Sequence, residues 1–214
     1  NEGIREIDLN IIEEAAQAQR VNYDKSGDNH YDVTSAFIKS LRGSDPDAAL
    51  YWYARMLYAN EDPRFIVRRL LVHAAEDVGL ADPNALLMAQ AAALALEWVG
   101  MPEARLPIGQ AIIYIATAPK SNSVLTAVES ALEVVSKTGA EPVPSHLRDT
   151  HYEGASKLGH GLDYKYPHEF PHHYVKQDYL PENVRNLKLY RPSNQGREKM
   201  FKERLEYFAN LKQQ

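Results

Sequence analysis

Three Asp-Pro pairs punctuate the first half of this chain, at Asp45-Pro46, Asp62-Pro63 and Asp82-Pro83. Each pair precedes a stretch in which apolar residues recur with helical spacing. An Asp carboxylate accepts hydrogen bonds from the free N–H groups of a first helical turn. A Pro at the first helical position gives up an N–H that would have no partner there. The three pairs therefore predict three helix starts and strongly constrain the possible folds.

Residues suited to left-handed backbone conformations follow the predicted helices. Gly43, Asn60, Gly79 and Gly100 each stand after a helical stretch, where a left-handed residue often ends a helix. The run Arg42-Gly43-Ser44-Asp45 is then interpreted as a helix stop followed by a helix start, and a phosphate-binding loop is the disfavoured alternative. The predicted helices span residues 9–21, 31–42, 46–59, 63–78, 83–99, 107–118, 123–137 and 196–211.

Short connections between these helices predict antiparallel neighbours, and hence an all-α fold of stacked helical hairpins. The helices at 83–99 and 107–118 are apolar around most of their circumference and rich in Ala. A helix of that kind is buried on all sides, either at the centre of the chain or against a second copy. We predict that a second copy supplies much of this contact. The candidate interface residues are Leu87, Leu94, Trp98, Ile108, Ile112 and Tyr114.

The composition changes after Gly139. Residues 140–195 contain six of the 12 prolines and six of the 8 histidines, and no helical period persists there. Tyr and Pro are frequent, which favours an ordered irregular segment laid over the helical core rather than a disordered linker. One short helix is predicted near residues 152–158.

Charge and composition exclude several function classes. The net charge of -5 and the pI near 5.9 give no overall basic footprint for nucleic acid. The chain has no Cys, which excludes disulfides and thiolate catalysis and suits a reducing cytosol. The most apolar run, residues 85–99, is too short to span a membrane.

Two motifs resemble catalytic signatures without the context that the chemistry needs. The sequence HEFPH at residues 168–172 matches the zinc-protease pattern, but Pro171 would interrupt the helix that must carry both His. Incidental metal binding by His168, His172 and His173 is a second alternative, and a solvated loop is the default. The sequence GASKLGHG at 154–161 has phosphate-loop glycine spacing but lacks the Lys and hydroxyl residue that contact phosphate and Mg²⁺.

Glu76 and Asp77 stand in the last turn of the predicted helix 63–78, where acidic side chains oppose the helix dipole. Basic groups of the same helix offset this charge in the simpler interpretation. In the second interpretation, an Arg that is distant in the sequence binds one of the two carboxylates. The candidates are Arg68, Arg69 and His73 within the helix, and Arg42 and Arg55 elsewhere.

Four long segments give the chain a family resemblance. They are HYDVTSAFIKSLRGSDPDAALYWYARML, EDPRFIVRRLLVHAAEDVGLADP, GMPEARLPIGQAIIYIATAPKSNS and YLPENV. These resemble the C-terminal half of the replication-associated recombination protein A family, and the resemblance covers nearly the whole chain from about Tyr23. That family consists of AAA+ ATPases that are related to clamp loaders and act at stalled replication forks.

The resemblance implies a domain organisation. Residues 1–28 are expected to form the end of the AAA+ lid. Residues 29–139 are expected to form the helical core of an oligomerisation domain that is similar to the clamp-loader collar. Residues 140–195 are then expected to pack on this core as an irregular segment, and residues 196–214 to form a last helix. The ATP-binding module is expected before Asn1, so ATP and Mg²⁺ are cofactors of the parent protein. No catalytic, cofactor or metal residue of the family has a matching position here.

The resemblance also implies partners. It implies a homotetramer, DNA at replication forks, single-stranded-DNA-binding protein as a further candidate partner, and a cytoplasmic, nucleoid-associated location. We therefore predict an oligomerisation domain without catalysis. The alternatives are a metallohydrolase and a DNA-binding module whose phosphate contacts are Lys39, Arg42, Arg64, Arg68, Arg69 and Lys120.

Overall fold

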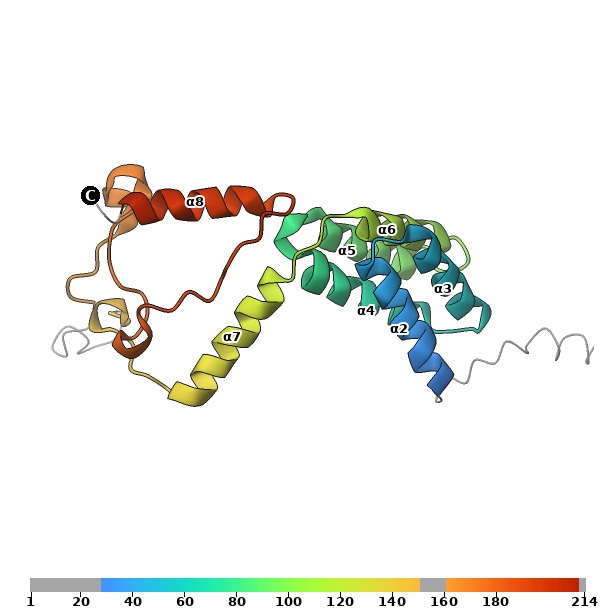
Figure 1. The fold of residues 1–214 in the computed structure, drawn as a ribbon, viewed down its shortest axis with the longest axis horizontal. Helices are drawn as coiled ribbons and strands as arrows, with labels where there is room; N and C mark the ends of the chain where they lie inside the picture. The colour runs from blue at the N-terminus through green and yellow to red at the C-terminus, as the bar shows by residue number, and fades with distance from the viewer. Residues whose placement is uncertain (1–27, 151–160, 212–214) are drawn as a thin grey trace, which may run out of the picture. The chain divides into compact units, whose positions relative to one another are not determined.

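The computed structural model describes residues 28–150 and 161–211, which fold into helices and irregular segments with no strand among them. The predicted all-α class is confirmed (Figure 1), whereas the clamp-loader-like arrangement stays a prediction.

The chain divides into two compact units, residues 1–121 and 122–214. The predicted domain limits stay predictions, and helices 9–21 and 152–158 lie outside the described residues. The α-helices are α2 (Asp28–Arg42), α3 (Pro46–Tyr58), α4 (Pro63–His73), α5 (Asn84–Trp98), α6 (Arg105–Thr117), α7 (Ser123–Thr138) and α8 (Glu198–Leu211).

All three Asp-Pro pairs stand at helix starts, as predicted. The Asp45 carboxylate accepts a hydrogen bond of 2.9 Å from the N–H of Ala48, and the Asp62 carboxylate accepts one of 2.9 Å from that of Arg64. Asp82 Oδ1 accepts one of 3.1 Å from the N–H of Asn84. Each carboxylate thus satisfies a first-turn N–H that has no partner inside the helix.

The left-handed residue after α2 is Ser44, with φ 60°, and not Gly43 as predicted. Gly43 is needed for space instead, because a Cβ there would lie 3.1 Å from the carbonyl oxygen of Lys39. The predictions at Asn60, Gly79 and Gly100 are confirmed, since all three have positive φ.

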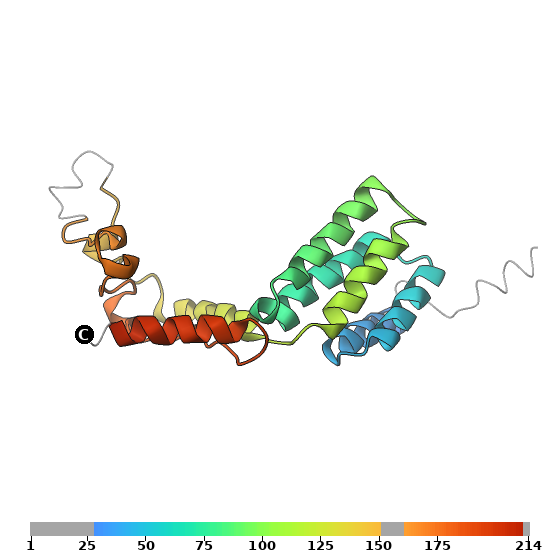
Figure 2. The ribbon, with the colours of Figure 1, turned by 90° about the horizontal axis from the view of Figure 1, so that it is seen from above.

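The first unit forms its core where α2, α3, α4, α5 and α6 meet. Helix α6 contacts α2, α3, α4 and α5, and α5 also contacts α4; Figures 1 and 2 show α5 and α6 side by side. Large side chains such as Phe37, Ile66 and Ile115 are fully buried, while α5 contributes small residues, including Ala85 and Ala89, that permit close approach of its neighbours.

Helix α4 ends at His73, and the chain continues as a π-helical turn, Ala74–Val78. The predicted helix 63–78 is thus α-helical only over its first eleven residues. A π-turn widens the helix by one residue per turn and often occurs where side chains are functionally placed. The turn carries Glu76 and Asp77, the two acidic residues that the sequence had placed in an unfavourable position.

A buried carboxylate joins three segments of the second unit. Glu198, at the start of α8, has no exposed surface. Ser193 donates to it at 2.6 Å and Tyr190 at 2.9 Å, and Ser123 at the start of α7 donates a further short hydrogen bond. Burial, together with this contact, raises the pKa of Tyr190 to about 12. The three hydroxyl groups supply hydrogen bonds in place of those that the carboxyl group would make to water if it were exposed.

The HEFPH segment contains two separate 3-10 turns, Pro167–Glu169 and Pro171–His173. Its two histidines therefore do not share one face of an α-helix, which the zinc-protease geometry requires. The rings of His168 and His173 lie 4.9 Å apart. The GASKLGHG segment lies, except for Gly161, outside the described residues.

Candidate interaction surfaces

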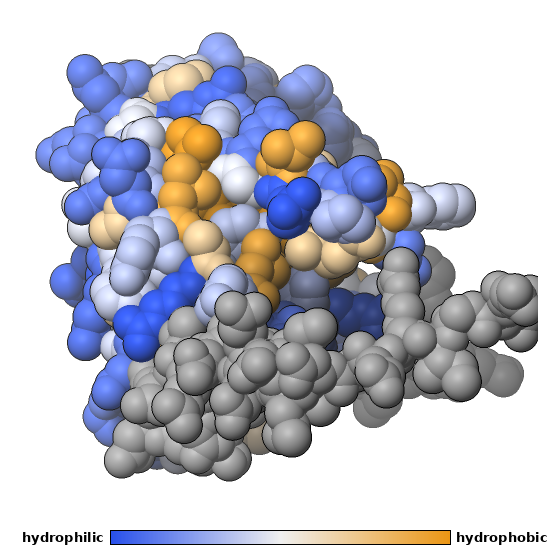
Figure 3. Space-filling view, turned by 90° about the vertical axis from the view of Figure 1, so that its right-hand side faces the viewer, coloured by the Kyte–Doolittle hydropathy of each residue, from blue (hydrophilic) through white to orange (hydrophobic). Residues whose placement is uncertain are grey.

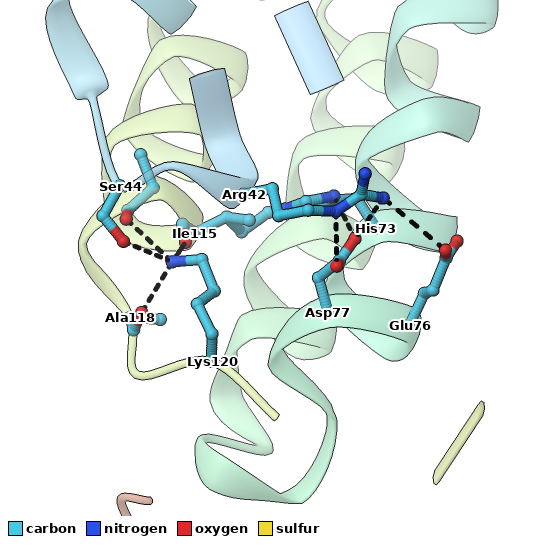
Figure 4. A network of polar contacts seen from close by, with 9 residues as sticks. Arg42, Ser44, His73, Glu76, Asp77, Ile115, Ala118 and Lys120 are labelled. Carbon is cyan, nitrogen blue, oxygen red and sulfur yellow. Dashed lines mark hydrogen bonds and ion pairs between the residues drawn. The ribbon is translucent and has the colours of Figure 1, made fainter. Parts of the chain in front are cut away.

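Arg42, one of the proposed DNA contacts, is held by the π-turn. Its Nε lies 2.7 Å from Asp77 Oδ1 and its Nη2 lies 3.0 Å from Asp77 Oδ2, so the two side chains form a bidentate ion pair (Figure 4). The Arg42 Nη2 atom also lies 3.6 Å from Glu76 Oε1. The hydrogen bond to Asp77 raises the pKa of Arg42. A distant Arg thus binds the acidic helix end, as the second sequence interpretation predicted.

His73 also contacts the Asp77 carboxylate. Its Nδ1 lies 2.8 Å from Asp77 Oδ2, but without the alignment of a hydrogen bond. The imidazole is 1% exposed, and burial lowers its pKa to about 4 despite the attraction of Asp77. His73 is therefore neutral near pH 7, and the contact holds only one formal positive charge, that of Arg42.

Lys120 is also committed to contacts inside the chain. Its ammonium group donates to the carbonyl oxygens of Ile115, Ala116 and Ala118 at 3.1, 2.8 and 2.6 Å, and to Ser44 Oγ at 3.2 Å. Figure 4 shows it among these groups. A cation at the end of α6 complements the negative pole of the helix dipole. Burial lowers the pKa of Lys120.

The other proposed DNA contacts do not form one described cluster with these two. Lys39, Arg64 and Arg68 are exposed, and Arg64 and Arg68 lie beside Glu97 in a shallow depression between α4 and α5. The Arg69 guanidinium lies over the Phe65 ring, 5.4 Å from its centre. Arg42 and Lys120 are bound within the chain, so Lys39, Arg64 and Arg68 are the exposed cations left among the six proposed DNA contacts. DNA binding by this chain stays a prediction.

The predicted apolar interface divides into two parts. Leu87, Leu94 and Trp98 on α5 are 60%, 49% and 85% exposed. Ile108 and Ile112 on α6 are fully buried in the core of the first unit, so they have no surface to offer a second copy and are withdrawn from the predicted interface. Tyr114 is half-buried, and its hydroxyl donates to Asp82 Oδ2 at 2.7 Å.

The outward residues of α6 are different from those predicted. Leu106 is 79% exposed and Ile113 is 46% exposed, and both line an apolar groove of about 640 Å³ between α3 and α6. The face shown in Figure 3 carries apolar side chains, in orange, in separate groups between polar ones. Because α6 is apolar on nearly all sides, the sequence could not distinguish the outward side chains from the inward ones.

Within residues 28–150 and 161–211, no helix has both the length and the apolar character needed to cross a membrane. In the same part of the chain, no three His, Asp or Glu side chains are grouped as metal ligands.

Two family models match this chain. The model described as AAA C-terminal domain matches residues 1–42, and the model described as MgsA AAA+ ATPase C terminal matches residues 43–209. These matches, together with the all-helical fold, identify the class as the C-terminal region of AAA+ ATPases.

Curated relatives agree with these matches. An uncharacterized AAA domain-containing protein of Mycobacterium tuberculosis is 50% identical over 200 residues, which cover 94% of this chain and 44% of that protein. Replication-associated recombination protein A of Bacillus subtilis is 47% identical over 191 residues, covering 89% and 45%. The Escherichia coli K12 protein of that name is 40% identical over 212 residues, covering 99% and 47%. The chain belongs to the MgsA, or replication-associated recombination protein A, family, and spans less than half the length of these relatives.

Proposed function

We propose that this chain is the self-association region of a AAA+ ATPase that acts in replication-associated recombination, and that it assembles as a homotetramer. The exposed apolar face of α5 carries the proposal. Leu87, Leu94 and Trp98 are spaced by seven and four residues, which places them on one side of the helix. A contiguous apolar face on the surface of a folded domain usually marks an interaction site.

The energy available from this face is substantial. Burial of an aromatic side chain removes about 150–250 Å² from water, at roughly 25 cal/mol per Å². Trp98, which is 85% exposed, therefore offers roughly 4 kcal/mol. Association costs about 4–15 kcal/mol in lost freedom of motion. Leu87 and Leu94, and the neighbouring exposed Val99, are then needed alongside Trp98 for a stable contact.

We assign catalysis to the parent protein and not to this chain. ATP and Mg²⁺ would bind the nucleotide-binding part of the parent, because the sequence here contains no strand–GxxxxGK[ST]–helix motif. DNA at replication forks and a single-stranded-DNA-binding protein are proposed partners of the parent, in the cytoplasm at the nucleoid. The name of the bacterial relatives, replication-associated recombination protein A, supports the link of the parent to replication and recombination.

Light scattering on the purified chain over a wide concentration range tests the assembly. We expect a tetramer that dissociates on dilution, and a monomer at every concentration would overturn the proposal. Leu94→Glu and Trp98→Glu are expected to dissociate it while the helical circular dichroism stays unchanged. Leu132→Glu is the matched control, because Leu132 is a 67% exposed Leu on another helix, α7, and receives the same charge. If Leu132→Glu dissociates the tetramer equally, the loss of assembly is not specific to the apolar face of α5.

A further inference from the structure

A shallow depression of about 320 Å³ lies between α4 and α5 in the first unit. Its floor is apolar and consists of buried or half-buried side chains, namely Val67, Leu71, Ala93 and Leu96. Three exposed charged side chains line its edge: Arg64 and Arg68 of α4, and Glu97 of α5. We call these three residues the charged rim. They place two positive charges and one negative charge close together on the surface.

The charged rim forms no ion pair of its own within the described part of the chain. Among the ion pairs of residues 28–150 and 161–211, none includes Arg64, Arg68 or Glu97. Arg42 and Asp77 of the same unit, by contrast, bind each other in a bidentate pair. The charges of the rim are therefore available to opposite charges on another surface.

The charged rim borders the apolar face of α5 that carries the self-association proposal. Glu97 stands directly before Trp98 and three residues after Leu94. Ala93 and Glu97 are four residues apart and both line the depression, so they mark the flank of α5 that is turned toward α4. A contact made through Leu94 and Trp98 would then have the charged rim along its edge. An apolar centre with a polar edge is the usual anatomy of a protein interface.

The charge distribution favours one relative orientation of two copies. In a two-fold contact the same surface meets itself, so every contact across the axis is reciprocal. An axis in the plane of the contact and at right angles to α5 makes the two α5 helices antiparallel. It also sets the α4 flank of one copy against the α4 flank of the other, so Glu97 of each copy can lie opposite Arg64 and Arg68 of the other. Two parallel α5 helices would put these flanks on opposite sides of the contact, where the charges stay unpaired.

We propose that two copies of this chain pair through α5 in antiparallel orientation, with Glu97 of each copy bound by Arg64 and Arg68 of the other. This inference rests on the proposed self-association and specifies its geometry. Because of the two-fold symmetry, each contact contains the set of ion pairs twice. Complementary charges at an interface fix its orientation and exclude wrong partners more than they add affinity. The apolar face of α5 supplies the buried area, and the charged rim selects the antiparallel arrangement.

Two complementary charge-reversal variants test the contact. One carries Arg64→Glu and Arg68→Glu, and the other carries Glu97→Arg. In each variant alone, like charges face each other across the axis, so we expect association to weaken about tenfold or more and light scattering to report a smaller species than the native chain. In an equal mixture, every contact between the two variants brings opposite charges together on both sides of the axis. We therefore expect mixing to restore the native molar mass, which ion pairs within one chain could not do.

Glu129→Arg is the matched control, because Glu129 is an exposed Glu in the middle of α7 and undergoes the same charge reversal. It is expected to leave the molar mass unchanged, and circular dichroism checks that all the variants keep their helices. Native association of either variant alone, or a mixture that stays dissociated, would overturn this inference while the self-association proposal stands. If the double Arg variant assembles normally but loses binding to duplex DNA, the two Arg contact phosphate instead. A native chain that is monomeric at every concentration would overturn both proposals.

Discussion

Acidification is expected to destabilise the first unit through His73. The imidazole is 1% exposed, and burial lowers its pKa from about 6.5 to about 4. Asp77 opposes this shift, whereas Arg42 and Lys120 add to it. Between these two pH values the unfolded chain binds a proton at this position and the folded chain does not. The free energy of unfolding therefore falls as the pH is lowered through that window.

The size of the effect follows from the pKa difference. At about 1.36 kcal/mol per pKa unit, His73 accounts for roughly 3 kcal/mol of stability that is present above pH 6.5 and lost by about pH 4. Urea unfolding followed by circular dichroism measures it, at one protein concentration and ionic strength, over several pH values within the window.

The control is His73→Leu, which fills the buried position with a side chain that cannot titrate. Its absolute stability differs from that of the native chain, but its pH dependence is expected to be shallower by the contribution of His73. An NMR titration of the native imidazole gives the pKa directly. Equal pH dependence in both proteins would refute the reasoning, and so would a His73 pKa near its ordinary value.

The remaining predictions concern the helix starts, the Arg42 ion pair and nucleotide. Asp45→Ala and Asp62→Ala are each expected to lower the unfolding free energy by about 1 kcal/mol, whereas Asp47→Ala, in the first turn of α3, is expected to have a smaller effect. Arg42→Ala is expected to cost about 1–3 kcal/mol, because Asp77 loses a charged partner. Arg68→Ala, on the exposed face of α4, is the control and is expected to lower the unfolding free energy less. If Arg42→Ala abolishes DNA binding but leaves the stability unchanged, Arg42 does not have the structural role assigned to it. Mg-ATP is expected to leave the Tm of this chain unchanged, and a saturable rise would reveal a nucleotide site.

The helix starts could be predicted because their cause is local. An Asp followed by Pro carries its own hydrogen-bond acceptor and its own backbone restriction, so Asp45 and Asp62 act in the structure as their sequence indicates. The residue at which α2 stops is also set locally, but residue type alone does not place it. Gly43 is placed against the carbonyl oxygen of Lys39, and the left-handed conformation falls on the next residue, which composition alone does not determine.

The surfaces were harder to predict because they depend on tertiary packing. Helix α6 has almost no polar side to reveal its orientation, so Ile112 and Ile113 could not be distinguished from the sequence, although one is fully buried and the other is 46% exposed. The link between Arg42 and Asp77 joins residues 35 positions apart. Sequence reasoning identified it only as one of two alternatives.

The buried Glu198 has an evolutionary consequence. Its carboxyl group has no contact with water and is hydrogen-bonded by hydroxyl groups from Ser123, Tyr190 and Ser193, and a buried polar group that loses a hydrogen-bond partner destabilises the fold. A lineage that lost one of these hydroxyls would be under selection to replace the carboxylate as well. We therefore expect these four positions to be inherited as a set, retained together or exchanged together, even though 75 positions separate Ser123 from Glu198.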